Sequence, residues 1–200
     1  MTPLDALYST LWLAGQLYAI LNPISVIPTY LSLTESLDND TRRKLLTKAT
    51  YVVLGLLAFF SLLGFYLLGF FGIDVNSLRV GGGILLMVIG IDMLGDVAQT
   101  RRMDPHEVMV VPIASPLLVG PGTLTLLLVS AERYPTPILL SSSLIATLGV
   151  HLTLRYCHHL TKFLGRNGVR AMGRLMSLII MAIAAEMVHA ALVAWGIARA

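Results

Sequence analysis

The chain contains apolar stretches that run for more than twenty residues without a charged side chain. No charged residue lies between Ala6 and Thr34, and none lies between Ala49 and Ile73. A helix needs about 20 apolar residues to cross the hydrocarbon core of a membrane. Only 12% of the residues are charged, which is about half the share expected of a soluble domain. The sequence therefore predicts an all-α integral membrane protein.

We expect six membrane-crossing helices in a single transmembrane domain over residues 1–200. Their approximate ranges are 6–33, 48–70, 78–95, 108–130, 137–157 and 175–198. If the N-terminus lies outside the cytoplasm, 11 of the 14 Lys and Arg residues fall in cytoplasmic loops, as the positive-inside rule requires. The pattern predicts a multi-pass protein of the cell inner membrane with both termini on the non-cytoplasmic side. Since the basic residues lie in loops between apolar runs, we expect no nucleic acid partner.

A Pro-x4-Pro step occurs once in each half of the chain, inside an apolar run. The first consists of Pro23 and Pro28, and the second of Pro116 and Pro121. Proline has no amide proton and its ring clashes with the preceding turn, so we expect the first helix of each half to be broken there. Broken backbone at membrane depth is tolerated only where it faces protein or a water-filled cavity.

The two proline steps also belong to an internal repeat. The second step follows the first by 93 residues, and Glu186 follows Asp92 by 94 residues. Repeats of about 1–96 and 107–200 each contain three predicted spans. Because three is an odd number, the second repeat is expected to be inverted in the membrane relative to the first. Inverted repeats that meet at broken helices are typical of secondary transporters.

The broken segments offer polar groups that suit a small zwitterion. Helix-start amides can hold a carboxylate, and freed carbonyls and polar side chains can accept hydrogen bonds from an ammonium group. Two prolines could also merely kink packed helices, but the duplicated step flanked by polar residues favours a binding site. The predicted substrate site comprises Asn22, Pro23, Ile24, Ser25, Pro28, Ser115, Pro116, Gly120, Pro121, Gly122 and Thr123.

Two carboxylates, Asp92 and Glu186, lie within apolar spans. A membrane carboxylate costs on the order of 2.5–3.5 kcal/mol on insertion scales, so such residues usually face a cavity or take part in proton transfer. We predict that the pair serves proton coupling or gating. For Asp92 the alternative is wetting at the cytoplasmic end or pairing with Arg101.

Residues with metal-binding or catalytic chemistry are sparse. His151, His158 and His159 share one helical face, but no acidic residue accompanies them in that span. No Ser-x-x-Lys, nucleophile-elbow or His-Glu-x-x-His pattern is present. We expect no metal, no other cofactor and no enzymatic activity.

Three segments resemble the MarC family of multi-pass inner-membrane proteins: 21–28, 81–86 with its glycine run, and 111–122. The resemblance covers essentially the whole chain. It implies a secondary transporter of small neutral amino acids such as glycine or alanine, in a family grouped with LysE-type exporters. The partners would be this substrate, protons and the lipid bilayer, and small residues on the spans suggest a homodimer. The alternatives are a channel or exporter for another small solute or ion, and a non-transporting membrane protein.

Overall fold

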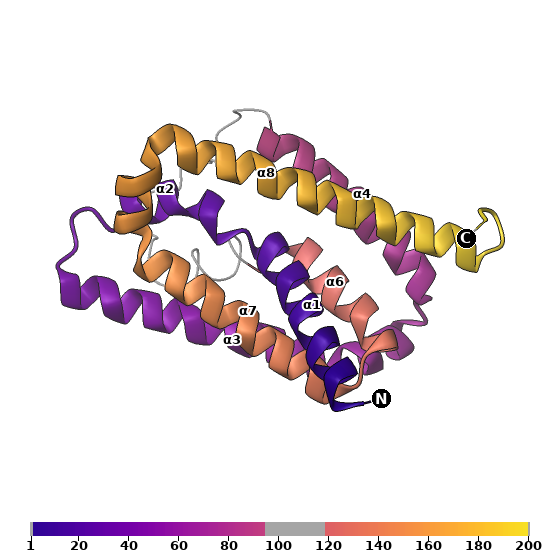
Figure 1. Ribbon diagram of the computed structural model, residues 1–200. Coiled ribbons are helices and arrows are strands. Elements are labelled where there is room, and N and C mark those ends of the chain that lie inside the picture. The colour runs from indigo at the N-terminus through magenta and orange to yellow at the C-terminus, as the bar shows by residue number, and fades with distance from the viewer. Residues whose placement is uncertain (1, 95–118, 200) are drawn as a thin grey trace.

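The computed structural model describes residues 2–94 and 119–199, and in those ranges its regular secondary structure is entirely helical (Figure 1). The all-α prediction is confirmed for these residues. The helices are α1 (Pro3–Leu21), α2 (Pro23–Leu33), α3 (Asn39–Phe71), α4 (Val75–Leu94), α6 (Pro121–Arg133), α7 (Thr136–Arg155) and α8 (Cys157–Ala194).

Five of the six expected spans have a counterpart among these helices. Four segments are long and apolar enough to cross a membrane alone: Asn39–Gly64, Val75–Leu94, Thr136–Arg155 and Asn167–Ala194. Helices α1 and α2 form a fifth candidate, with a bend of 44° between them. The predicted span at 108–130 lies partly outside the described residues. Within them, its counterpart is the short helix α6. The structure thus supports a multi-pass membrane protein with four or five candidate spans.

Several helix ends follow local sequence signals. Thr2 and Asp5 form a capping box at the start of α1, which therefore begins before the predicted position 6. Asp38 accepts backbone hydrogen bonds from the first turn of α3, as a short polar residue at a helix start should. Gly72 ends α3 in the left-handed conformation, with φ 64°, where a residue without a side chain is favoured.

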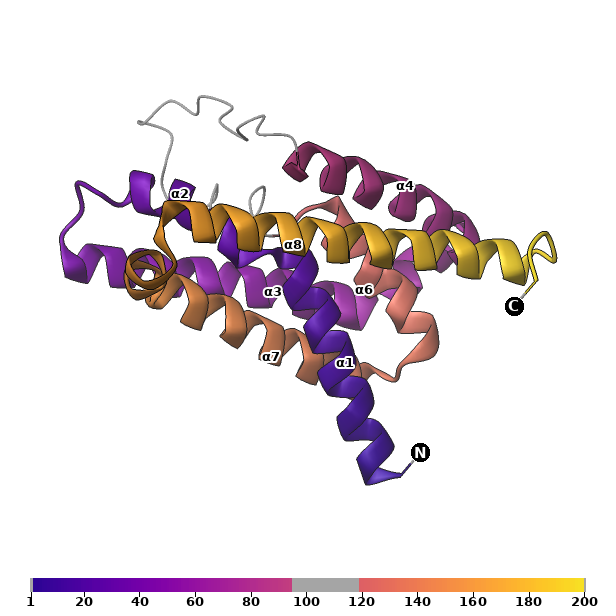
Figure 2. The same cartoon turned by 45° about the horizontal axis from the view of Figure 1, so that its top comes forward.

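The main helix contacts join the part of the chain before residue 94 to the part after residue 119. Helix α4 lies along α8, α1 and α3 pack against α7, and α6 packs against α3 and α4 (Figures 1 and 2). Polar side chains of α7 contribute to this packing. The Ser142 hydroxyl donates to the Thr10 carbonyl at 3.0 Å, and the hydroxyls of Ser61 and Ser143 lie 3.3 Å apart. These two serine side chains of α7 thus join helices within the protein.

Helices α4 and α8 pack closely and run antiparallel. A β-carbon placed on Gly83 would lie 2.9 Å from the Ala184 carbonyl oxygen, and one placed on Gly90 would lie 3.3 Å from the Ser177 carbonyl oxygen. Adding the repeat offset of 94 turns positions 83 and 90 into 177 and 184. The repeat offset therefore converts the Gly83–Ala184 contact into the Gly90–Ser177 contact. Two helices related by a two-fold axis have contacts related in this way. The arrangement of all six helices as inverted repeats stays a prediction.

The basic segments around Arg42 and His158 lie at one end of the molecule. Arg42 near the start of α3 is hydrogen-bonded to His158 at the start of α8. At the opposite end, Arg79 of α4 forms an ion pair with Glu132 of α6 at 2.8 Å. Both described termini also lie at the end away from the α2–α3 loop (Figure 1). This placement agrees with the loop grouping assumed in the charge argument, while the orientation in the membrane stays a prediction.

Candidate functional site

Asn22 is the point at which the first membrane segment breaks. Its φ of 42° and ψ of 56° place it in the left-handed region, and it is the only residue other than glycine with positive φ in the described ranges. A residue before proline avoids the helical region, and asparagine tolerates the left-handed one better than most. Asn22 therefore ends α1 and starts α2. Its side-chain oxygen accepts from the Ser25 amide at 3.4 Å, and its side-chain nitrogen donates to the Met93 sulfur at 3.7 Å.

The interruption is narrower than the Pro-x4-Pro step at which we expected the helix to be broken. Pro23 is the first residue of α2, and Pro28 lies inside that helix. A proline at the first helical position needs no intrahelical donor, so Pro23 starts a helix instead of extending the break. Pro28 lacks an amide proton and leaves the Ile24 carbonyl without its usual helix partner. The expectation of an unwound stretch up to Pro28 was wrong, and the break is confined to Asn22.

A small cavity of about 130 Å³ lies beside the break. It is lined by Ser25, Pro28, Met93, Val169, Arg170, Gly173 and Arg174. A β-carbon on Gly173 would lie 2.9 Å from the Ser25 hydroxyl oxygen, so the glycine lets α8 approach Ser25 closely beside the cavity. Two residues of the predicted site, Ser25 and Pro28, therefore line a cavity together with α8.

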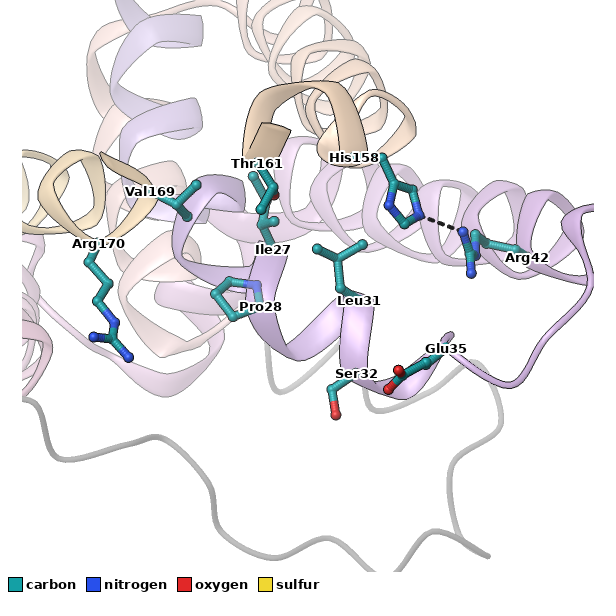
Figure 3. A pocket seen from close by; sticks show the side chains of 10 residues that line it. All are labelled: Ile27, Pro28, Leu31, Ser32, Glu35, Arg42, His158, Thr161, Val169 and Arg170. Atoms are coloured by element: carbon teal, nitrogen blue, oxygen red, sulfur yellow. Dashed lines mark hydrogen bonds between the residues drawn. The ribbon is translucent and has the colours of Figure 1, made fainter. Parts of the chain in front are cut away.

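A second cavity of about 670 Å³ adjoins the first and shares Pro28, Val169 and Arg170 with it. Its volume is within the range of about 300–1,000 Å³ that is usual for small-molecule sites. Helix α2, α3 and both parts of α8 surround it (Figure 3). Gly165, with φ 68° and ψ 170°, separates those two parts of α8, so that His158 and Arg170 both reach the cavity wall.

Arg42 is held firmly in the wall of the larger cavity. Its Nη1 atom lies 2.6 Å from His158 Nε2, and its Nη2 atom donates to the Thr34 carbonyl at 2.8 Å. Because arginine can only donate, His158 Nε2 must be the acceptor. The buried Arg42 Nε has no hydrogen-bond partner among the residues that the structure describes.

The described residues of the second predicted segment, Gly120 to Thr123, do not line these two cavities. Ser115 and Pro116 lie outside the described residues. Gly120 precedes α6, and Pro121 is its first residue. A β-carbon on Gly122 would overlap a methyl carbon of Leu86, so Gly122 serves close packing of α6 on α4. Thr123 is also buried.

Asp92 and Glu186 are exposed and lie outside both cavities. Asp92 is nine residues after Gly83, and Glu186 is nine residues after Ser177. At about 100° per residue, nine residues place each carboxylate on the helix face opposite the α4–α8 contact. The antiparallel register also places the two carboxylates toward opposite ends of this helix pair.

Sequence reasoning did not select the cationic wall of the larger cavity. Arg42 and Arg170 were counted only as basic loop residues, and His158 was weighed as a metal ligand or as part of a wetted helix end. A basic residue at a helix end has no local signal that distinguishes a loop charge from a cavity wall. The described residues contain no group of three His, Cys, Asp or Glu side chains that could hold a metal.

The helices and cavities define a multi-spanning membrane protein with two adjoining cavities, of which the smaller lies beside the break in its first membrane segment. A model of the MarC family of integral membrane proteins matches residues 8–195. The chain therefore belongs to the MarC family.

Similar proteins come from archaea and bacteria. A UPF0056 membrane protein of Methanocaldococcus jannaschii is 32% identical, covering 87% of this chain and 91% of the relative. A UPF0056 membrane protein of Pyrococcus abyssi is 31% identical, covering 86% of this chain and 88% of the relative. A UPF0056 membrane protein of Buchnera aphidicola is 31% identical, covering 88% of each chain. No solved structure matches the chain.

Proposed function

We propose that this protein is a secondary transporter of small neutral amino acids such as glycine or alanine. The observation that carries the proposal is the cavity beside Ser25, which lies next to a break in an apolar helix pair. Non-helical backbone at membrane depth is expected where it lines a cavity, and broken helices mark the sites of many transporters. The substrate would occupy the cavity that Ser25, Pro28 and Arg170 line.

The proposed transport cycle uses the two halves of the chain as inverted repeats. The exchange of the Gly83–Ala184 and Gly90–Ser177 contacts by the repeat offset supports this arrangement. Rocking of one half against the other would open the cavity to each membrane face in turn. Asp92 or Glu186 would supply proton coupling. We also propose that the protein belongs to the LysE-type superfamily of exporters. The protein would lie in the inner membrane with both termini outside the cytoplasm.

Flux measurements on purified protein in liposomes test the proposal. We expect uptake of radiolabelled glycine and alanine, stimulated by a pH gradient, with empty liposomes as the background. Gly173→Ala narrows the space next to Ser25 and should reduce this uptake. Gly55→Ala is the matched control, because a β-carbon there has no atom within 4 Å. Wild-type protein that moves neither amino acid, with or without the gradient, contradicts the proposal.

The coupling role has its own variants. Asp92→Asn and Glu186→Gln remove the charge and preserve side-chain size. Loss of the response to the pH gradient, with exchange of glycine retained, is the expected result for the coupling residue. An unchanged gradient response in both single variants and the double variant contradicts the coupling role.

A second candidate is a channel or exporter for another small solute, specifically an anionic one. The arginines of the larger cavity favour it. Uptake of acetate that exceeds glycine uptake in the same liposomes would support this candidate over the first.

A further inference from the structure

The larger cavity carries positive charge on two of its walls. Arg42 comes from α3 and Arg170 from the second part of α8, and between them lie the apolar side chains of Ile27 and Leu31 (Figure 3). A guanidinium group stays charged at all physiological pH values. Charge beside apolar walls interacts more strongly with a ligand than charge in open water does.

Arg42 is already immobilised by protein groups. His158 and the Thr34 carbonyl hold its two terminal nitrogens, while the covered Nε has no partner within the described residues. Buried donors are nearly always paired. The wall of the cavity therefore contains a fixed positive charge.

Arg170, in contrast to Arg42, is not held by other protein groups of the described residues. It lines both cavities and so stands at their junction. Within the described ranges it has no hydrogen bond or ion pair. A guanidinium group binds a carboxylate or phosphate through two parallel hydrogen bonds. Arg170 is exposed, and no described residue occupies its side-chain donors.

We propose that the junction of the two cavities is a binding site for an oxyanion, a carboxylate or a phosphate group, held by Arg170. Arg42 on the opposite wall adds positive charge, and Glu35 near the outer side of the larger cavity is suited to a ligand's ammonium group. This site rests on the proposed function in part, because it assigns the substrate's carboxylate to Arg170. Binding of the oxyanion is measurable without transport.

The test is a binding titration at constant ionic strength, with the protein in nanodiscs of phosphatidylcholine. The probes are sodium acetate, glycine, sodium phosphate and ethanolammonium chloride. A native mass spectrometry arm measures retention of phosphatidylglycerol, which separates a lipid headgroup from a soluble anion. The variants are Arg170→Gln, Arg42→Gln and Glu35→Gln. Lys162→Gln is the control, because it removes an exposed positive charge from the same helix outside the cavity.

We expect acetate or phosphate to bind and ethanolammonium not to compete. Arg170→Gln should weaken binding by about tenfold or more, since it removes charge-assisted hydrogen bonds. Arg42→Gln should weaken it by about threefold through lost positive potential, and Lys162→Gln should leave it unchanged. Glu35→Gln should weaken the binding of glycine but not the binding of acetate. Retention of phosphatidylglycerol that depends on Arg170 also supports the site and identifies its ligand as a headgroup.

Two results overturn the oxyanion site. One is equal binding by Arg170→Gln and wild type for every anionic probe and for phosphatidylglycerol. The other is the absence of binding of all anionic probes to folded wild type. Oxyanion binding without amino acid flux would leave this site standing and contradict the proposed function alone. Glycine flux unaffected by Arg170→Gln would leave the proposed function standing and contradict the assignment of the substrate's carboxylate to Arg170.

Discussion

The Nη1 atom of Arg42 donates a hydrogen bond to Nε2 of His158 across 2.6 Å, although the two residues are 116 positions apart. The same guanidinium reaches the carbonyl of Thr34, the residue that ends α2. One side chain therefore joins α2, α3 and α8 at the basic end of the protein, beside the larger cavity.

Replacing His158 should loosen this junction. His158→Ala removes the acceptor of the Arg42 hydrogen bond and should lower the free energy of unfolding by about 1 kcal/mol. His158→Gln restores an acceptor oxygen and should recover most of the loss. Thermal unfolding of the two variants in detergent is the measurement. Equal melting temperatures for His158→Ala and wild type would contradict the role of this contact.

The left-handed conformation of Asn22 predicts an unusual order of substitutions. Asn22→Ala should lose about 1–2 kcal/mol because a side chain with a β-carbon is strained there, and it also loses the helix cap. Asn22→Gly keeps the backbone conformation and loses only the cap, so it should be the milder change. Melting temperatures compare the two directly. A glycine variant less stable than the alanine variant would show that the backbone at position 22 is not strained.

The glycines of α4 should resist enlargement where they face α8. A leucine at Gly90 would overlap Met181 and approach the Ser177 carbonyl, and overpacking of this kind costs about 1–3 kcal/mol. Gly69→Leu is the control, because a β-carbon at Gly69 has no atom within 4 Å. Unfolding measurements on both variants should show a large loss only for Gly90→Leu. A similar loss in both variants would argue against the α4–α8 contact.

Cys157 should react slowly with alkylating agents. Burial raises the pKa of its thiol above the ordinary value, so the reactive thiolate is scarce at neutral pH and increases only as the pH rises. Its side chain is also 1% exposed. Maleimide labelling at pH 7 should be much faster for Cys157→Ser/Lys162→Cys than for wild type, since position 162 is exposed. Comparable rates would indicate that the start of α8 opens readily.

The predicted orientation can be checked with fusions. Alkaline phosphatase attached after Ala200 should be active, because it folds only outside the cytoplasm, and a fluorescent protein attached there should be dark. A fluorescent protein inserted in the α2–α3 loop should be bright, since that loop lies at the opposite end. A bright C-terminal fusion would reverse the assignment of both membrane faces.

Local chemistry made much of the fold predictable. Apolar runs indicated the helices, and the first Pro-x4-Pro step, at Pro23 and Pro28, indicated where the first segment breaks. The sequence also suggested more unwinding than occurs, because a proline at the start of a helix and a proline inside a helix are both read as breaks. Asp92 and Glu186 were expected near a cavity, although their nine-residue spacing from Gly83 and Ser177 already places them on the opposite helix face.

The sequence by itself determined the helices, their caps and the break at Asn22, because each depends on neighbouring residues and on the length of an apolar run. Only the tertiary structure decided which residues surround the cavities. Arg42 and Arg170 lie far apart in the chain, and they meet across one hollow because Gly165 redirects α8 and Gly173 lets it approach Ser25. Such contacts depend on how separate helices pack, and no local sequence pattern specifies that packing.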